Sequence, residues 1–142
     1  MERVVIRKAD LAKLAGSGRF FAPGFAAGGE PGGGPRACEL VENPDPILFD
    51  FANVRVPLKE LFLPQTELLC TFDYDQITEV PLPQQAILVF GCRPCDARAM
   101  AQLDTVFGPE NKGWQDPYFQ KRRENAVVIP LACSSPCPTC FC

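Results

Sequence analysis

Two apolar runs separated by a helical pattern constrain the fold of this chain more than any other feature. Residues 86–90 and 126–129 have the aliphatic and aromatic composition of strands that are covered on both faces. Between them, residues 96–107 place apolar side chains at helical spacing, and a short helix is expected over 117–123 with Asp116 as its cap. Strand, helices and strand in this order predict a right-handed βαβ unit with two parallel strands.

Cysteines follow both predicted strands. Cys92 and Cys95 come after the first strand, and Cys133 comes after the second. Parallel strands bring their carboxyl ends to one edge of a sheet, where open α/β folds usually bind ligands. We therefore expect the two cysteine loops to converge at one edge of a βαβ unit that spans residues 86–142.

The remainder of the chain predicts shorter elements, and the 142 residues suit a single domain. We expect strands over 38–41, 47–51 and 67–72 and a short helix over 57–63. The glycine-rich segment 16–36 matches no phosphate-binding pattern and is expected to be a flexible surface loop. Cys38 and Cys70, each alone in an apolar run, are expected to be buried free thiols. The predicted fold class is α/β: a small mixed sheet with a parallel βαβ unit and cysteine loops at the strand C-terminal ends.

Composition excludes several classes of function. The net charge is −3 and no basic stripe is present, which argues against a nucleic-acid partner. No apolar run reaches the roughly 20 residues of a membrane span, and the start of the chain lacks the apolar core of a signal peptide. We expect a cytoplasmic protein, in which clustered cysteines are metal ligands or redox groups. The sequence has no histidine and no nucleophile paired with a base, so no catalytic site is expected.

Thiolates are the expected metal donors. Six of the eight cysteines lie within 92–95 and 133–142, and four soft thiolates select an iron–sulfur cluster or zinc. The C-x3-C-x2-C-x-C spacing from Cys133 through Cys137 and Cys140 to Cys142 is not a clean second CxxC knuckle, and six thiolates exceed what one zinc uses. Spacing therefore favours iron–sulfur over zinc. A thioredoxin-like redox pair, Cys92 with Cys95, is a third interpretation.

Several motifs occur in order along residues 54–142. They lie at 57–67, at 90–96 (F-G-C-R-P-C-D), at 103–107 (L-D-T-V-F), at 116–125 and at 133–142, which ends in T-C-F-C. In these motifs the chain resembles the N-terminal part of a family of iron–sulfur subunits. The family includes the beta subunit of cytoplasmic sulfhydrogenases and the corresponding iron–sulfur subunit of anaerobic sulfite reductase.

This resemblance implies that Cys95, Cys133, Cys140 and Cys142 bind a [4Fe–4S] cluster. Cys92 and Cys137 stand where the family more often has other residues, so they are either thiols beside the cluster or ligands that replace or supplement this set. Arg93 and Asp96 flank the predicted cluster loop. They either tune the cluster through charge and hydrogen bonds or serve as a solvated arginine and a helix cap.

The family also implies a function and a longer chain. Its members continue past the C-F-C motif into a ferredoxin-like region with two further clusters, so we expect this chain to be an N-terminal fragment. The expected function is electron transfer in an anaerobic multisubunit oxidoreductase, such as a hydrogenase or sulfite reductase. Its partners would be two subunits, one that contains flavin and one that is catalytic. The alternative is a zinc-binding structural module that acts in complex assembly. Without metal, residues 132–142 should be partly disordered.

Overall fold

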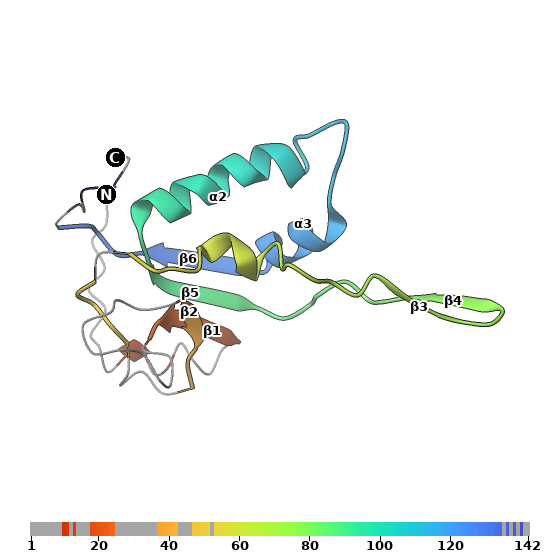
Figure 1. The fold of residues 1–142 in the computed structure, drawn as a ribbon, viewed down its shortest axis with the longest axis horizontal. Helices are drawn as coiled ribbons and strands as arrows, with labels where there is room; N and C mark the ends of the chain where they lie inside the picture. The colour runs from red at the N-terminus through yellow and green to blue at the C-terminus, as the bar shows by residue number, and fades with distance from the viewer. Residues whose placement is uncertain are drawn as a thin grey trace.

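The computed structural model describes residues 10, 11, 13, 18–24, 37–42, 47–51, 53–134, 136, 138 and 140. It has an α/β fold in which helices pack on a mixed sheet (Figure 1). In the described part of the chain, four strands form this sheet in the order β2–β1–β5–β6. The strands are β1 (Arg19–Pro23), β2 (Cys38–Leu40), β5 (Ile87–Cys92) and β6 (Ala126–Pro130). Strand β5 runs parallel to both β1 and β6, whereas β2 is antiparallel to β1. The predicted small mixed sheet is confirmed.

The connection from β5 to β6 contains two helices, as the sequence predicts. Helix α2 (Pro94–Phe107) and helix α3 (Pro117–Glu124) link two parallel strands and complete the βαβ unit. Asp116 caps α3, because its carboxylate accepts hydrogen bonds from the backbone N–H groups of Tyr118 at 2.9 Å and Phe119 at 3.0 Å. Strand β5 extends past the predicted run 86–90, through Gly91 with its φ of +84°, and ends at Cys92.

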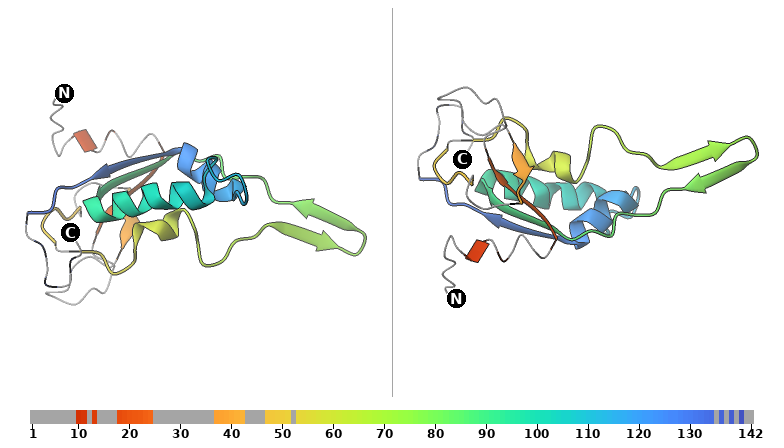
Figure 2. Two further views of the ribbon diagram at one scale, coloured as in Figure 1. Left: turned by 90° about the horizontal axis from the view of Figure 1, so that it is seen from above. Right: turned by 90° about the horizontal axis from the view of Figure 1, so that it is seen from below.

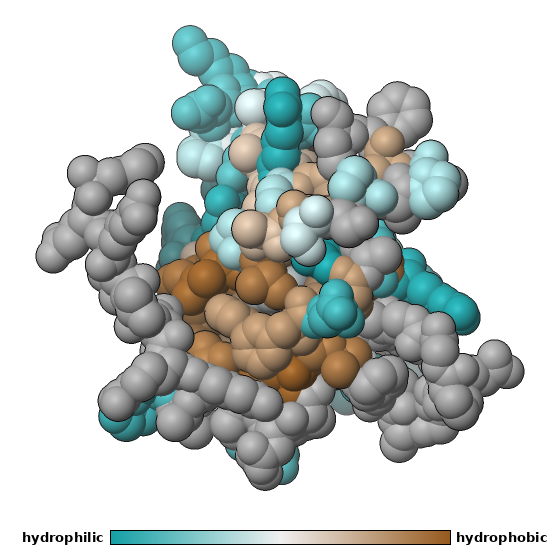
Figure 3. Space-filling model, turned by 90° about the vertical axis from the view of Figure 1, so that its left-hand side faces the viewer, coloured by the Kyte–Doolittle hydropathy of each residue, from teal (hydrophilic) through white to brown (hydrophobic). Residues whose placement is uncertain are grey.

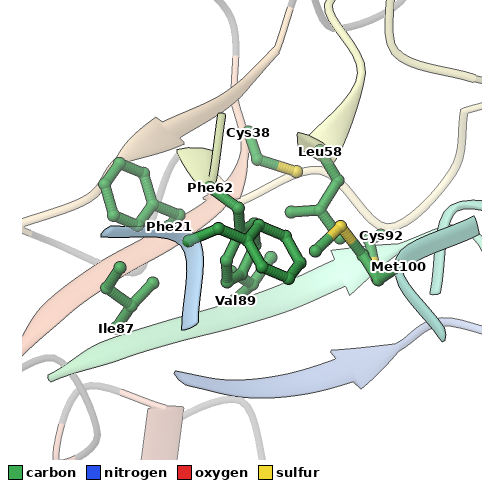
Figure 4. Packing of buried hydrophobic residues seen from close by; sticks show 9 residues of the cluster. Phe21, Cys38, Leu58, Phe62, Ile87, Val89, Cys92 and Met100 are labelled. Carbon is green, nitrogen blue, oxygen red and sulfur yellow. The ribbon is translucent and has the colours of Figure 1, made fainter. Parts of the chain in front are cut away.

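Buried side chains form two clusters because alternate residues of a strand point to opposite faces of the sheet. The larger cluster joins Phe21 and Val89 of the sheet to Met100 of α2, Phe119 of α3 and Phe62, and Figure 4 shows its packing. The smaller cluster is formed by Leu11, Phe20, Ala22, Val41 and Ile47. The helices therefore cover one face of the sheet, and N-terminal segments cover the other.

The prediction of a loop over 16–36 is wrong for residues 19–23. These residues form β1, which lies between β2 and β5 and pairs Phe21 with Val89. Three successive residues of this segment, Phe20, Phe21 and Ala22, are buried. A strand explains this burial, because its alternate side chains point to opposite faces of the sheet and both faces are covered: Phe21 packs in the larger cluster, and Phe20 and Ala22 pack in the smaller one. The glycines at 28–34 lie outside the described residues.

Other short elements also differ from the prediction. Residues 47–51 form no strand, although the N–H of Leu48 donates to the carbonyl of Pro23 at 2.9 Å. The predicted helix over 57–63 is a single 3₁₀ turn, η1 (Leu58–Leu61). The predicted strand over 67–72 is β3 (Cys70–Asp73), which pairs with an unforeseen strand, β4 (Gln76–Glu79). Cys70 is exposed, so its predicted burial is wrong, whereas Cys38 is buried as predicted.

Strands β3 and β4 form a hairpin that projects from the body of the protein (Figures 1 and 2). Both further views in Figure 2 show it extending past α3, at the end opposite to the start of α2. Among the described residues, no helix combines the length and hydrophobicity that crossing a membrane requires.

Candidate metal centre

The predicted cysteine loops leave the same edge of the sheet. Strand β5 ends at Cys92 opposite Pro130, the last residue of β6, and the N–H of Leu131 donates to the carbonyl of Cys92 at 2.8 Å. Cys95 follows in the first turn of α2, and Cys133 lies three residues beyond the end of β6. Figure 1 shows the β5–α2 turn and the chain after β6 at one end of the protein. The parallel topology therefore confirms the shared edge predicted for the loops.

The structure separates Cys92 from Cys95. Cys92 is 1% exposed and belongs to the core cluster with Leu58 and Met100 (Figure 4). Burial, and next the nearby Asp96 carboxylate, raise the pKa of Cys92 to about 11. Cys95, by contrast, is an exposed free thiol. Cys92 therefore has the packing of a core side chain, whereas Cys95 is accessible to a ligand.

The remaining candidate ligands are only partly described. Cys133 is exposed and Cys140 is half-buried, while Cys137 and Cys142 lie outside the described residues. Within the part of the chain that the structure describes, no three Cys, Asp or Glu side chains are grouped as a metal site. The fold thus brings the loops that carry Cys95 and Cys133 to one edge of the sheet.

Arg93 connects the two loops and is buried. It is 6% exposed, and its guanidinium carbon lies 4.0 Å from the centre of the Phe51 ring, a cation–π contact. Its Nη1 donates a long hydrogen bond of 3.5 Å to the carbonyl of Ala132, just before Cys133. The interpretation of Arg93 as a solvated side chain is wrong, because the buried guanidinium lies between the Phe51 ring and the chain after β6.

Asp96 lies in the first turn of α2 and is not its N-cap, which is Arg93. Its Oδ2 is buried and has no hydrogen-bond partner among the described residues. Burial raises the pKa of this carboxyl, although a hydrogen bond with the Arg93 backbone and the charge of Arg93 oppose the rise. A raised pKa favours the neutral acid, whose O–H can donate to a sulfur or oxygen atom. The residue that follows Cys95 in the sequence therefore carries a buried carboxyl oxygen, Asp96 Oδ2, without a hydrogen-bond partner among the described residues.

The surroundings of this edge are apolar. Figure 3 views the protein from this end and shows hydrophobic residues gathered in the middle of the face. Buried Cys38 lies in the same core cluster as Cys92, and burial is the main cause that raises its thiol pKa to about 12. A low-polarity shell of this kind limits water access to a metal–sulfur centre and influences its potential.

The donor set suits a sulfur-ligated metal. With no histidine in the sequence, the cysteines are the soft donors that the loops offer, and soft thiolates bind iron–sulfur clusters or zinc. The shared sheet edge, the accessible Cys95 and the unpartnered Asp96 oxygen agree with a bound group at this position.

Two features of the protein were not expected from the sequence. The burial of Arg93 has no local signal, because the Phe51 ring and the Ala132 carbonyl that receive it are distant in the chain. The hairpin of β3 and β4 did have a signal, since apolar and polar residues alternate from Phe72 to Thr78 around a turn at Asp73–Gln76.

No family model, no curated protein and no solved structure matches this chain. The resemblance to the iron–sulfur subunits therefore stays a prediction, and the function proposed next depends on the residues and their placement.

Proposed function

We propose that this chain binds a [4Fe–4S] cluster through Cys95, Cys133, Cys140 and Cys142 and acts as an electron-transfer domain. It would be the N-terminal part of an iron–sulfur subunit in an anaerobic multisubunit oxidoreductase, such as a hydrogenase or sulfite reductase. One observation carries the proposal. The parallel strands β5 and β6 end side by side, and each is followed by a cysteine that is accessible at the same sheet edge.

The packing of the two neighbouring thiols supports the choice of ligands. Cys92 is enclosed by apolar side chains, and burial favours its protonated form, whereas a metal ligand must be a thiolate. Cys95 is exposed at the start of α2, where the helix dipole favours negative charge. We therefore propose Cys95 as the ligand from this loop.

When bound, the cluster would supply a one-electron carrier. The protein's own contribution is to hold the ligand loops together and to set the charge around them. Arg93 joins the two loops through Ala132, and its positive charge next to a thiolate-rich site should raise the reduction potential of a bound cluster. The chemistry on a substrate would then occur in partner subunits, one containing flavin and one catalytic.

A cytoplasmic location is part of the proposal. Cys38, Cys70, Cys92 and Cys95 are free thiols, and such thiols persist in a reducing compartment. Anaerobic cytoplasm would also preserve an oxygen-sensitive cluster.

The test is to purify the chain without oxygen and to measure iron, acid-labile sulfide and zinc beside the visible spectrum and the EPR of the reduced protein. We expect about four iron and four sulfide per chain and a brown colour that dithionite bleaches. The matched variants are Cys95→Ser and Cys70→Ser, because both thiols are exposed but only Cys95 lies at the sheet edge. Cys95→Ser should lose iron, and Cys70→Ser should retain it.

A colourless protein that contains one zinc and no sulfide, even from anaerobic cells, would instead support the structural zinc module. If Cys95→Ser and Cys70→Ser bound iron equally well, the proposed ligand set would be wrong. Metal binding should also slow amide exchange over residues 132–142, because their ordering would be coupled to it.

A further inference from the structure

The hairpin of β3 and β4, which we call the hairpin arm (residues 68–80), is presented to solvent on all sides. Each of its strand residues is exposed, and Figures 1 and 2 show the arm extending away from the sheet, opposite to the cysteine loops. An isolated two-stranded hairpin is marginally stable in water. A hairpin that extends away from the body of the protein therefore indicates a function other than packing in the protein's own core.

The arm has an apolar face and a polar face. In an antiparallel pair, residues directly opposite each other point to the same side, so Phe72 and Ile77 share one face with Cys70, and Glu79, opposite Cys70, places an acidic residue at the base of this face. Phe72 is 84% exposed and Ile77 is 77% exposed. The opposite face carries Thr71, Asp73, Gln76 and Thr78. An amphipathic hairpin normally buries its apolar face, but no described segment of this chain covers it.

The tip of the arm also exposes a large aromatic side chain. Tyr74 is fully exposed and has a φ of +26°, a backbone conformation that is unfavourable for a bulky residue. Glycine or asparagine would satisfy this turn with less strain. Strain at an exposed aromatic residue is typical of a contact site, since folding alone gives no reason for tyrosine there.

The base of the arm is fixed to the body. The hydroxyl of Tyr118 in α3 donates to the carbonyl of Val80 at 3.0 Å, and the N–H of Val80 donates to the carbonyl of Leu69 at 2.9 Å. Arg122 of α3 forms an ion pair with Glu67, just before the arm. A groove of about 700 Å³ at this base is lined mainly by apolar residues, including Ile77, Pro81 and Leu82. The arm is thus anchored, and its apolar face continues into a groove that can receive a side chain.

Charge identifies the kind of partner. The arm carries Asp73, Asp75 and Glu79, and the sequence has no lysine or arginine from residue 61 to residue 92. This acidic surface is repelled by nucleic-acid phosphates and by anionic membranes. Two copies of the arm stacked face to face would also bring their acidic residues together, which is unfavourable. The complementary surface is an apolar groove on another protein, with basic residues around its rim.

We propose that the hairpin arm docks into an apolar groove, rimmed by lysine and arginine, on a partner protein subunit. Phe72, Ile77 and Tyr74 provide the apolar contacts, and the acidic residues orient the arm. The arm lies at the end of the protein opposite to the β5–α2 turn and the chain that follows β6 (Figure 1), so it anchors a partner while the cysteine edge remains accessible. The docking does not depend on a bound metal.

The experiment uses the full 142-residue chain in its native cells. A photoreactive benzoylphenylalanine replaces Phe72 on the apolar face, and in a matched control it replaces Thr71 on the opposite face. Mass spectrometry of the cross-linked product identifies the contacted peptide. We expect the Phe72 position, and not the Thr71 position, to cross-link to one other protein at a peptide that combines apolar residues with lysine or arginine.

The cross-linked protein is then purified and its affinity measured. The Phe72→Ser/Ile77→Ser variant should bind about tenfold or more weakly, because buried aromatic anchors dominate interfaces. Asp75→Lys should weaken binding roughly threefold or more, whereas Glu110→Lys, which reverses an exposed acid on the α2–α3 loop, should not. Every substituted side chain is exposed, so circular dichroism and melting temperature should match the wild type.

Several outcomes would overturn the proposal. These are cross-linking to a second copy of this chain, equal cross-linking from positions 71 and 72, and an unchanged affinity for Asp75→Lys. Cosedimentation of the chain with vesicles of phosphatidylcholine and phosphatidylglycerol, lost in Phe72→Ser/Ile77→Ser, would also contradict it. Iron analysis of each arm variant keeps the two proposals separate, since docking should be lost with the metal content unchanged.

Discussion

Replacing Cys92 and Cys95 separately by serine should give opposite results, although only two residues separate them. Cys92 is 1% exposed and lies among Leu58, Phe62 and Met100. Serine there would bury a hydroxyl group among apolar side chains. Cys95→Ser changes an exposed side chain and should leave the stability of the metal-free chain unchanged within about 0.5 kcal/mol.

The size of the effect follows from the burial of Cys92. In proteins, a buried hydroxyl without a hydrogen-bond partner costs about 1–3 kcal/mol. For a domain of this length, each kcal/mol lowers the melting temperature by roughly 2–4 °C, so we expect a decrease of roughly 2–12 °C for Cys92→Ser. Iron and sulfide content should be retained in Cys92→Ser and lost in Cys95→Ser.

The assay is thermal unfolding of the metal-free proteins beside iron and sulfide analysis of anaerobically purified ones. Cys92→Ala is the control, because it removes the sulfur without burying a hydroxyl and should destabilise less than Cys92→Ser. If Cys92→Ser lost the iron and kept the wild-type melting temperature, Cys92 would be a ligand and the assignment made from its burial would be refuted.

Three further predictions concern the framework of the site and the arm. Asp116→Ala should lower the free energy of unfolding by about 1 kcal/mol in urea denaturation, since it removes the cap of α3, whereas Asp116→Asn should cost only a few tenths. Burial raises the pKa of Cys38 to about 12, so above about pH 9 the unfolded chain loses this proton while the folded chain keeps it. Stability should therefore fall with rising pH by up to about 1.4 kcal/mol per unit from this thiol, and unfolding curves of Cys38→Ala should lack this component. Tyr118→Phe removes the hydroxyl that holds the base of the arm, so hydrogen exchange at the Val80 amide should accelerate while exchange in β5 stays unchanged.

The sequence alone determined the βαβ unit, because its signals are local. The apolar runs before Cys92 and Cys133 predicted two strands, and Asp116 with Pro117 predicted the start of α3. The predicted burial is wrong for β6, which lies at the edge of the sheet and leaves Val127 59% exposed. The handedness rule for crossovers then implied parallel strands, and so the common edge from which the cysteine loops leave. For the candidate site, the choice of sulfur donors also came from the sequence, since there is no histidine to consider.

Only the tertiary structure decided what depends on contacts between distant segments. Residues 19–23 form a strand because their backbone pairs with β5, more than 60 residues away, and a run of five residues carries little of that information. Arg93 is buried because Phe51 and Ala132 meet it from other parts of the chain. Cys92 and Cys95 have the same side chain, but Cys92 ends a strand over the core, whereas Cys95 is exposed in the first turn of α2. The environment of each thiol was therefore set by the packing around the strand end, which the spacing of the cysteines does not encode.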